Sequence, residues 1–379
     1  MNYMKVLLIS FTLFFSGVAL ATEVSLRDKI GQMLIIGFEG KTVNKKSPII
    51  KTINETSLGG VILFDFNFQT NTFDKNIESP AQVKELNQQL QEANQKANKK
   101  HHRPQLPLLI SVDYEGGAVN RLSKNYGFPE TFSAAVVGKM ALSEASKVAD
   151  LMGKTLEESG FNLDFAPILD LNVNPDNPII SKLERSFSAN PSEVAKYSHL
   201  FSRAFLQRGV QCAYKHFPGH GSATADSHLG FVDVTATWQA SELEPYRLLA
   251  NEDNSCGMIM TAHIVNRRLD DSGLPATLSH KVLTDVLRKQ LQFKGVIITD
   301  DMQMKAISEH YGLERALPLA INAGADMFIF GNQLMGKSQD PKQVIDLIEA
   351  KVHSGEISQS RIDEAYQHII AFKRSTKRI

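Results

Sequence analysis

Eight short apolar runs recur along the chain, and stretches with helical periodicity separate them. The runs span residues 32–38, 59–66, 107–117, 161–171, 209–217, 256–264, 295–301 and 325–332. Their apolar character is nearly continuous rather than alternating, which is expected of parallel strands that are buried on both faces. Eight buried strands alternating with helices predict an α/β protein built as a single (β/α)8 barrel of the TIM type.

Several of the intervening stretches carry helix start signals. Ser79, Asn190 and Asp340 each stand directly before a proline, so a capping side chain precedes a proline in the first turn. Further helices are predicted from Ser279 onward and over residues 358–372. An open doubly wound sheet is the alternative, but the glycine-rich turn expected after its first strand is missing. No linker or repeat interrupts the pattern, so residues 22–379 are expected to form one domain.

The N-terminal segment predicts a cleavable signal peptide over residues 1–21. A short start with one lysine precedes the apolar run of residues 6–21, which ends in the cleavage signature Ala19-Leu20-Ala21. A membrane anchor is the alternative reading, but this run is short for a membrane span. We therefore expect the mature chain to start near Thr22 and to be periplasmic or secreted.

Charge and cysteine content restrict the partners and the cross-links. The 379 residues include 41 basic and 41 acidic side chains, so nothing indicates nucleic acid or an anionic membrane as a partner. Cys212 and Cys256 could pair in an oxidising compartment. Each lies in an apolar run, where a reduced buried cysteine is natural, so the sequence favours two thiols over a disulfide.

Charged and imidazole side chains gather near the ends of the predicted strands. In a barrel, the active site forms at the C-terminal ends of the strands and on the loops that follow them. The strand starts carry no comparable group of charges, so these side chains predict a site at one rim. They are Asp113 in the third run, Lys215 and His216 in the fifth, His263 in the sixth and Asp300 in the seventh, with Arg121 and Arg185 on the loops after the third and fourth runs.

The stretch YKHFPGHGSATADSHLG, residues 214–230, concentrates the groups that can transfer protons. Asp226 and His228 are two residues apart, so the carboxylate can orient the imidazole, and such a histidine can exchange protons near neutral pH. The residues from Pro218 to Gly221 are expected to act as a hinge that brings this pair in. No role is assigned to His220.

Asp300 and Asp301 are adjacent at the end of a strand, so only one of them is expected to enter the barrel mouth. A carboxylate there can be a nucleophile, a general base or a metal ligand. The other aspartate suits a capping role. A metal site is the alternative reading for His216, His220, His228 and His263 with Asp300. Barrel amidohydrolases typically also need an H-x-H pair at the end of the first strand, and IIGFEG contains no histidine.

Together, KHFPGHG with the following D-S-H, ITDDM and VDYEGG resemble glycoside hydrolase family 3. Within that family, the chain is similar to the single-domain bacterial β-N-acetylhexosaminidases of the NagZ type, over nearly the whole of residues 22–379. The resemblance implies retaining hydrolysis of terminal β-linked N-acetylglucosamine without a metal or cofactor. Asp300 would be the nucleophile, and His228, assisted by Asp226, would be the acid and base. Sugar-binding positions carry over to Asp113, Arg121, Arg185, Lys215 and His216.

Three departures from the family pattern leave the chemical identity of the leaving group undetermined. Relatives commonly have an arginine where this chain has Ala118, the loop over residues 66–79 is longer than in compact relatives, and a signal peptide is predicted. Peptidoglycan fragments and chitin-like oligosaccharides are both expected substrates, and the protein is expected to be a monomer. A β-glucosidase, a phosphorylase and a non-catalytic muropeptide-binding protein are the alternatives.

Overall fold

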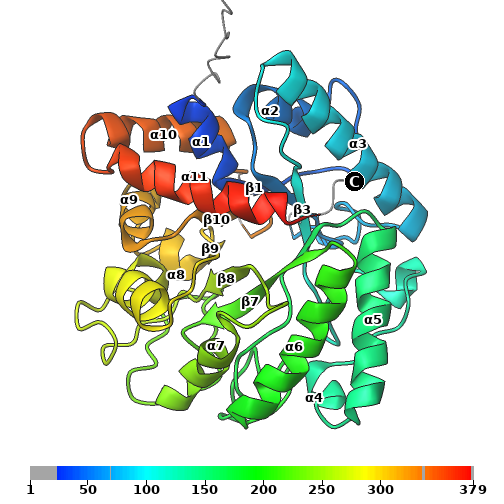
Figure 1. The fold of residues 1–379 in the computed structure, drawn as a ribbon, viewed down its shortest axis with the longest axis vertical. Coiled ribbons are helices and arrows are strands. Elements are labelled where there is room, and N and C mark those ends of the chain that lie inside the picture. Colours follow the sequence, from blue (N-terminus) through cyan, green and yellow to red (C-terminus); the bar gives the residue numbers. More distant parts are fainter. Residues whose placement is uncertain (1–23, 69, 335–337, 377–379) are drawn as a thin grey trace, which may run out of the picture.

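The computed structural model describes residues 24–68, 70–334 and 338–376. Eight parallel strands form a closed barrel in the order β1-β10-β9-β8-β7-β6-β3-β2 (Figure 1). Each strand lies within one of the eight apolar runs, so the predicted (β/α)8 barrel is confirmed. The strands are β1 (Leu34–Gly37), β2 (Gly60–Ile62), β3 (Leu109–Val112), β6 (Leu163–Asp164), β7 (Gln211–Phe217), β8 (Met258–Thr261), β9 (Val296–Asp301) and β10 (Met327–Phe330).

Helices surround the strands (Figure 1) and bury their apolar faces against the barrel. The first and last parts of the chain meet here, because α1 packs against both α10 and α11. The α-helices of more than one turn are α1 (Leu26–Gln32), α2 (Pro48–Thr56), α3 (Pro80–Lys100), α5 (Leu142–Glu158), α6 (Pro191–Gln207), α7 (Glu244–Leu249), α9 (Leu313–Ala323), α10 (Pro341–His353) and α11 (Gln359–Arg374), and the π-helical segment η4 covers Lys281–Gln290.

The predicted helix starts are confirmed by their hydrogen bonds. Ser79 Oγ accepts from the backbone N–H of Gln82 at 3.2 Å, and Asn190 Oδ1 accepts from that of Ser192 at 2.9 Å. The Asp340 carboxylate accepts from the N–H of Lys342 at 3.0 Å. Each cap satisfies an N–H group that has no partner within its helix, which fixes where the helix begins.

The third apolar run is not one strand, contrary to the prediction. Strand β3 ends at Val112, and the chain then forms an antiparallel hairpin of β4 (Tyr114–Gly116) and β5 (Val119–Asn120). Gly116 and Gly117 have φ angles of 88° and 60°, a region that glycine enters without strain. The two glycines therefore turn the chain out of the barrel and place Glu115 on a separate ribbon above it.

The two cysteines form a disulfide, so the expectation of two thiols is wrong. Cys212 lies in β7 and Cys256 lies just before β8, and their Cα atoms are 4.9 Å apart. Strands β7 and β8 are parallel neighbours, with Ala213 opposite Met258. Barrel pairing thus brings together two cysteines that lie far apart in the sequence.

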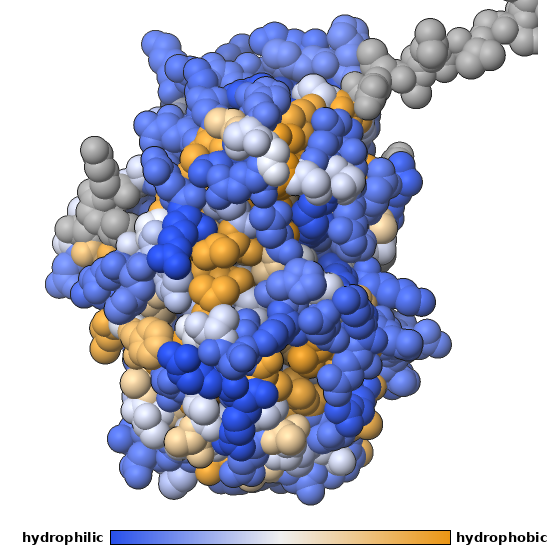
Figure 2. Space-filling view, turned by 90° about the vertical axis from the view of Figure 1, so that its left-hand side faces the viewer, coloured by the Kyte–Doolittle hydropathy of each residue, from blue (hydrophilic) through white to orange (hydrophobic). Residues whose placement is uncertain are grey.

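The surface is mainly hydrophilic on the side seen in Figure 2, and hydrophobic residues form smaller patches between the hydrophilic ones. None of the helices in the described ranges combines the length and the apolar character that a membrane crossing requires. The predicted signal peptide, residues 1–21, lies outside the described residues.

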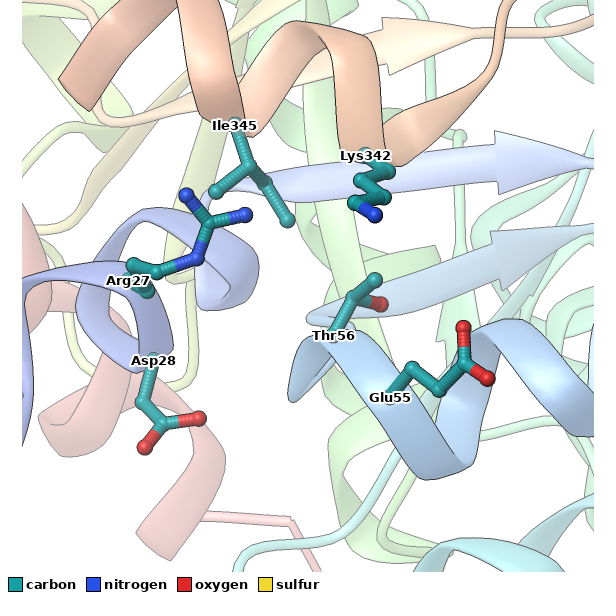
Figure 3. Close-up of a pocket in the computed structure, with 6 residues that line it drawn as sticks. All are labelled: Arg27, Asp28, Glu55, Thr56, Lys342 and Ile345. Carbon is teal, nitrogen blue, oxygen red and sulfur yellow. The ribbon is translucent and has the colours of Figure 1, made fainter. Parts of the chain in front are cut away.

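A small pocket of about 280 Å³ lies between helices α1, α2 and α10. Figure 3 shows side chains from all three helices around it. The sequence-predicted site residues are not among its lining residues, which are Arg27, Asp28, Glu55, Thr56, Lys342 and Ile345.

Candidate active site

All eight residues that the resemblance assigned to catalysis or sugar binding line one pocket of about 700 Å³. The pocket lies at the C-terminal ends of the barrel strands, because Asp113 directly follows β3 and Lys215, His216 and Asp300 stand near the ends of β7 and β9. A pocket at this rim is where a barrel presents its variable loops to a ligand. The other four residues come from such loops: Arg121, Arg185, Asp226 and His228.

Asp300 is an ionised carboxylate with histidines around it. Burial alone would raise the pKa of its carboxyl, but the imidazoles of His263, His216 and His228 outweigh burial and lower that pKa to about 2. Its Oδ1 accepts a hydrogen bond of 2.8 Å from the backbone N–H of Asp301. Asp300 is therefore negatively charged near neutral pH, as a nucleophilic carboxylate must be.

The Asp301 carboxylate is hydrogen-bonded to backbone N–H groups on both oxygens, unlike that of Asp300. Its Oδ1 accepts from the N–H of Gln303 at 2.9 Å, and its Oδ2 accepts from the N–H of Gly331 at 3.2 Å. Burial raises the pKa of this carboxyl to about 7. The two adjacent aspartates thus have different environments, and the capping role expected for the second aspartate fits these contacts.

His263 stands behind Asp300 in a defined tautomer. Its Nε2 lies 3.0 Å from the backbone carbonyl oxygen of Asp301, which can only accept, so Nε2 carries the proton. Its Nδ1 lies 2.7 Å from the Thr277 hydroxyl, and that hydroxyl donates to the Ala262 carbonyl oxygen at 3.0 Å. Burial lowers the pKa of His263, so the ring is neutral at neutral pH.

Asp226 and His228 form the pair that the sequence predicted. The Asp226 carboxylate lies 2.7 Å from His228 Nδ1 and also accepts from the His228 backbone N–H at 2.8 Å. Burial acts to lower the pKa of His228, but the hydrogen bond to Asp226 and the charge of Asp300 raise it above its ordinary value. Because Nδ1 is engaged, Nε2 is the nitrogen left to exchange a proton in the pocket.

A buried charge network that the sequence did not reveal forms the floor of the pocket. Glu115 accepts two hydrogen bonds of 2.8 Å from Arg185 and lies 2.7 Å from Lys215 Nζ. Lys215 Nζ also donates to Asp113 at 2.9 Å. Burial acts to raise the pKa of Glu115, yet the two cations hold that pKa far below its usual range. Glu115 thus fixes both cations although it does not line the pocket itself.

Asp170 is a second residue that sequence reasoning missed. Its carboxylate lies 2.6 Å from His216 Nδ1 and accepts from the backbone N–H of His220 at 2.7 Å. Since a carboxylate only accepts, His216 Nδ1 carries a proton and Nε2 remains for the pocket. Asp170 is the second-last residue of the fourth apolar run, a position where a charged residue is a signal for the barrel rim.

Arg121 is held less tightly than the other cations of the pocket. Its guanidinium lies 3.9 Å from Asp65 and over the ring of Phe64, 5.9 Å from the ring centroid. Its side chain retains 28% exposure, against 8% for Arg185. Arg121 can therefore adjust to a ligand, whereas Arg185 is fixed before any ligand arrives.

The packing of the segment from Pro218 to Gly221 does not favour the predicted hinge. This segment is buried throughout. A Cβ atom on Gly221 would lie 2.0 Å from the Leu171 carbonyl oxygen, and one on Gly219 would lie 2.6 Å from the Glu242 side chain. These glycines therefore allow close packing, and the first exposed residue after them is Thr224.

In the described part of the chain, no group of three or more histidine, cysteine, aspartate or glutamate side chains has an arrangement that could hold a metal ion. His220 has its own buried surroundings, with Nε2 3.3 Å from the Ser227 hydroxyl. Burial lowers the pKa of His220 to about 4, so it is neutral near pH 7.

Comparison with known proteins places this arrangement in a family. Residues 25–372 match the model of the glycosyl hydrolase family 3 N-terminal domain. The chain is 32% identical to Beta-hexosaminidase A of Pseudoalteromonas piscicida, over 87% of this chain and 59% of that protein. It is also 34% identical to the Beta-hexosaminidase of Tolumonas auensis, over 75% of this chain and 78% of the relative.

Solved structures agree with these relatives. The fold matches a family 3 β-N-acetylglucosaminidase from Paenibacillus with a TM-score of 0.81 and 33% identity, covering 93% of this chain and 63% of that one. It matches a β-N-acetylhexosaminidase from Beutenbergia cavernae with a TM-score of 0.79 and 26% identity, covering 93% and 99% of the two chains. The chain thus spans less than two thirds of some relatives and nearly all of others. As its sequence motifs predicted, the chain belongs to glycoside hydrolase family 3.

Proposed function

We propose that the protein is an exported, retaining β-N-acetylhexosaminidase. Its substrates would carry terminal β-linked N-acetylglucosamine, in peptidoglycan fragments or chitin-like oligosaccharides. The observation that carries the proposal is that the ionised Asp300 and the Asp226–His228 pair line one pocket. A nucleophile and a proton-transferring group are the two requirements of a double-displacement hydrolysis. The beta-hexosaminidases among the relatives support the choice of sugar.

In the first step, an Asp300 carboxylate oxygen attacks the anomeric carbon and the bond from that carbon to the leaving oxygen breaks. His228 Nε2 gives its proton to that oxygen, so the leaving group departs as a neutral alcohol. Asp226 stabilises the imidazolium that supplies the proton, because its carboxylate holds Nδ1 at 2.7 Å. The imidazole thus takes the place of the second carboxylate found in most retaining glycosidases.

In the second step, neutral His228 accepts a proton from a water molecule, and the resulting hydroxide oxygen bonds to the anomeric carbon. The bond between that carbon and Asp300 breaks, which restores the carboxylate and releases the sugar with its original configuration. Asp113, Arg121, Arg185, Lys215 and His216 would bind the hydroxyl and acetamido groups of the sugar. The ion pairs of Lys215 with Asp113 and of Arg185 with Glu115 are formed in advance, which limits the reorganisation needed on binding.

Export is part of the proposal because of residues 1–21. The Cys212–Cys256 disulfide supports it, since disulfides form and persist mainly in oxidising compartments. Fractionation of cells that express the full chain tests this point. Finding the intact N-terminus on a cytoplasmic protein would contradict export.

The catalytic assignment is tested with para-nitrophenyl N-acetyl-β-glucosaminide. We expect Asp300→Ala to lower kcat/KM by roughly a thousandfold or more. His228→Ala should slow an alkyl glycoside more than this aryl glycoside, because a good leaving group needs less protonation. Asp271→Ala is the matched control, since Asp271 is an exposed aspartate paired with Lys281. Full activity of Asp300→Ala would contradict the nucleophile, and faster turnover of the glucoside or dependence on phosphate would favour another glycosidase or a phosphorylase.

A further inference from the structure

Exposed apolar side chains stand around the mouth of the same pocket. We call Phe68, Leu183, Leu229 and Leu334 the apolar collar; their exposures are 57%, 38%, 74% and 39%. They lie on the loops after β2, β6, β7 and β10, so they come from several sides of the barrel. Large apolar side chains exposed beside a polar site indicate a surface that a ligand covers.

The described residues of the loop after β2, 66–68 and 70–79, pack around Phe68 and anchor the base of the loop. Phe66 packs edge to face against Phe68 and Phe73, with ring centroids 4.8 Å and 4.9 Å away. At the base of the loop, Lys75 is fully buried, donates to the Asn332 carbonyl oxygen at 2.6 Å and pairs with Glu39 at 3.0 Å. The Phe68 ring is thus exposed, but the loop that carries it is anchored. The side chain therefore loses little conformational entropy when a ligand covers it.

The proposed chemistry fixes which part of a substrate meets the collar. The terminal sugar would occupy the charged floor of Lys215, Arg185 and Asp113, next to Asp300. The leaving oxygen would lie at His228, so the group attached to it extends away from the floor toward solvent. Leu229 directly follows His228 in the chain and is the most exposed member of the collar. The leaving group therefore passes between the collar side chains.

The charges around the pocket disfavour an anionic leaving group. Its lining carboxylates are Asp113, Asp226, Asp300, Asp301 and Glu309, and its lysines and arginines are Arg121, Arg185, Lys215 and Lys305. Each of these four cations already has a carboxylate within 4 Å, and so does the His228 imidazole, which pairs with Asp226. An added carboxylate would find only cations that are already compensated, and the fixed carboxylates would repel it.

We propose that the apolar collar is the leaving-group subsite and that it selects a neutral pyranoside, such as a second N-acetylglucosamine, over an anionic muramic acid unit. The proposal rests on the proposed function and narrows its substrate class to chitin-like oligosaccharides. A pyranose presents a face of C–H bonds that packs on an aromatic ring, and its rim of hydroxyl groups stays in water. Phe68 is the aromatic member of the collar and supplies that contact.

The test compares three substrates that share the same terminal sugar. They are methyl N-acetyl-β-glucosaminide, the N-acetylglucosamine disaccharide and the N-acetylglucosaminyl-N-acetylmuramic acid disaccharide. We expect kcat/KM to be higher for the neutral disaccharide than for the anionic one by roughly tenfold or more. Phe68→Ala should lower kcat/KM for the neutral disaccharide by roughly 3- to 10-fold and leave the methyl glycoside unchanged. Phe68→Trp should retain the wild-type preference.

Phe132→Ala is the matched control, because Phe132 is 44% exposed and is not among the pocket-lining residues. Equal rates on the two disaccharides would overturn the selection. An equal loss on the methyl glycoside in Phe68→Ala would overturn the subsite. If the wild type cleaves none of the substrates, the proposed function fails, and calorimetry then tests the collar separately: unchanged affinity of Phe68→Ala for the neutral disaccharide would overturn it.

Discussion

Asp226 controls the proton affinity of its neighbour His228. The two residues share a hydrogen bond between Asp226 Oδ1 and His228 Nδ1, and Asp226 also accepts from the His228 backbone. The carboxylate therefore has two effects: it fixes the ring and it favours the imidazolium. Burial opposes the second effect, but the pKa of His228 still lies above its ordinary value.

We expect Asp226→Asn to move the pH dependence of the enzyme toward acid. Loss of the carboxylate removes an interaction that raises the pKa of His228, so the protonated ring disappears at a lower pH. The alkaline limb of kcat/KM, which requires protonated His228, should therefore shift to lower pH. The profile is measured on the methyl glycoside, and Asp271→Asn serves as the control. A limb that stays at the wild-type pH would show that another group titrates there.

At the residue scale, the sequence predicted the groups in the pocket but not the groups that hold them. Asp300, His228 and Lys215 stand out because each is polar where a strand ends or in a loop after it. Glu115 and Asp170 act on partners that lie 70 and 46 residues away in the sequence. Such contacts form only when the barrel is closed, so no local sequence pattern predicts them.

At the scale of elements, the β4–β5 hairpin is joined through Glu115 to the loop after β6 and to strand β7. The Glu115 carboxylate bonds Arg185 from the loop after β6 and Lys215 from β7. The sequence predicts the end of a strand here, because the apolar character of the segment continues through Tyr114. The positive φ angles of Gly116 and Gly117 end that continuity, and glycine letters alone do not reveal whether a strand bends.

We expect Glu115→Gln to weaken both the fold and sugar binding. The variant leaves Arg185 and Lys215 buried without the anion that they share, which should lower the free energy of unfolding by roughly 3–5 kcal/mol. KM should rise, because both cations lose their fixed positions. Denaturant unfolding and steady-state kinetics measure the two effects.

The matched control for this prediction is Glu193→Gln. Glu193 forms a half-exposed ion pair with Lys196, so its loss should cost less than about 1 kcal/mol. Similar losses of stability in the two variants would mean that the buried network contributes no more than a surface pair.

At the scale of the whole molecule, the eight strands were predictable because parallel strands buried on both faces have nearly continuous apolar sequences. The disulfide was not, since the cysteines approach only through the pairing of β7 with β8. The cross-link joins two neighbouring strands, with Cys212 near the start of β7 and the pocket residues Lys215 and His216 farther along that strand.

We expect the variant with both Cys212→Ala and Cys256→Ala to be less stable but catalytically normal. Removal of the cross-link should lower the free energy of unfolding by roughly 2–4 kcal/mol. Alanine suits both positions because both are buried. Wild type treated with a thiol reductant should unfold at the same denaturant concentration as the variant. An unchanged unfolding midpoint after reduction would contradict the stabilising role.

Closure of the barrel by β1 and β10 has a consequence for synthesis. Leu34 pairs with Phe328, so β1 can complete its pairing only after β10, near the end of the chain, has been synthesised. Until residues 327–330 are available, β1 and β9 each present an unpaired edge that can recruit other chains. Nascent or truncated chains that end before Met327 should therefore aggregate or require a chaperone. If translation stops before this residue, the released chain has an open sheet that can associate with other chains.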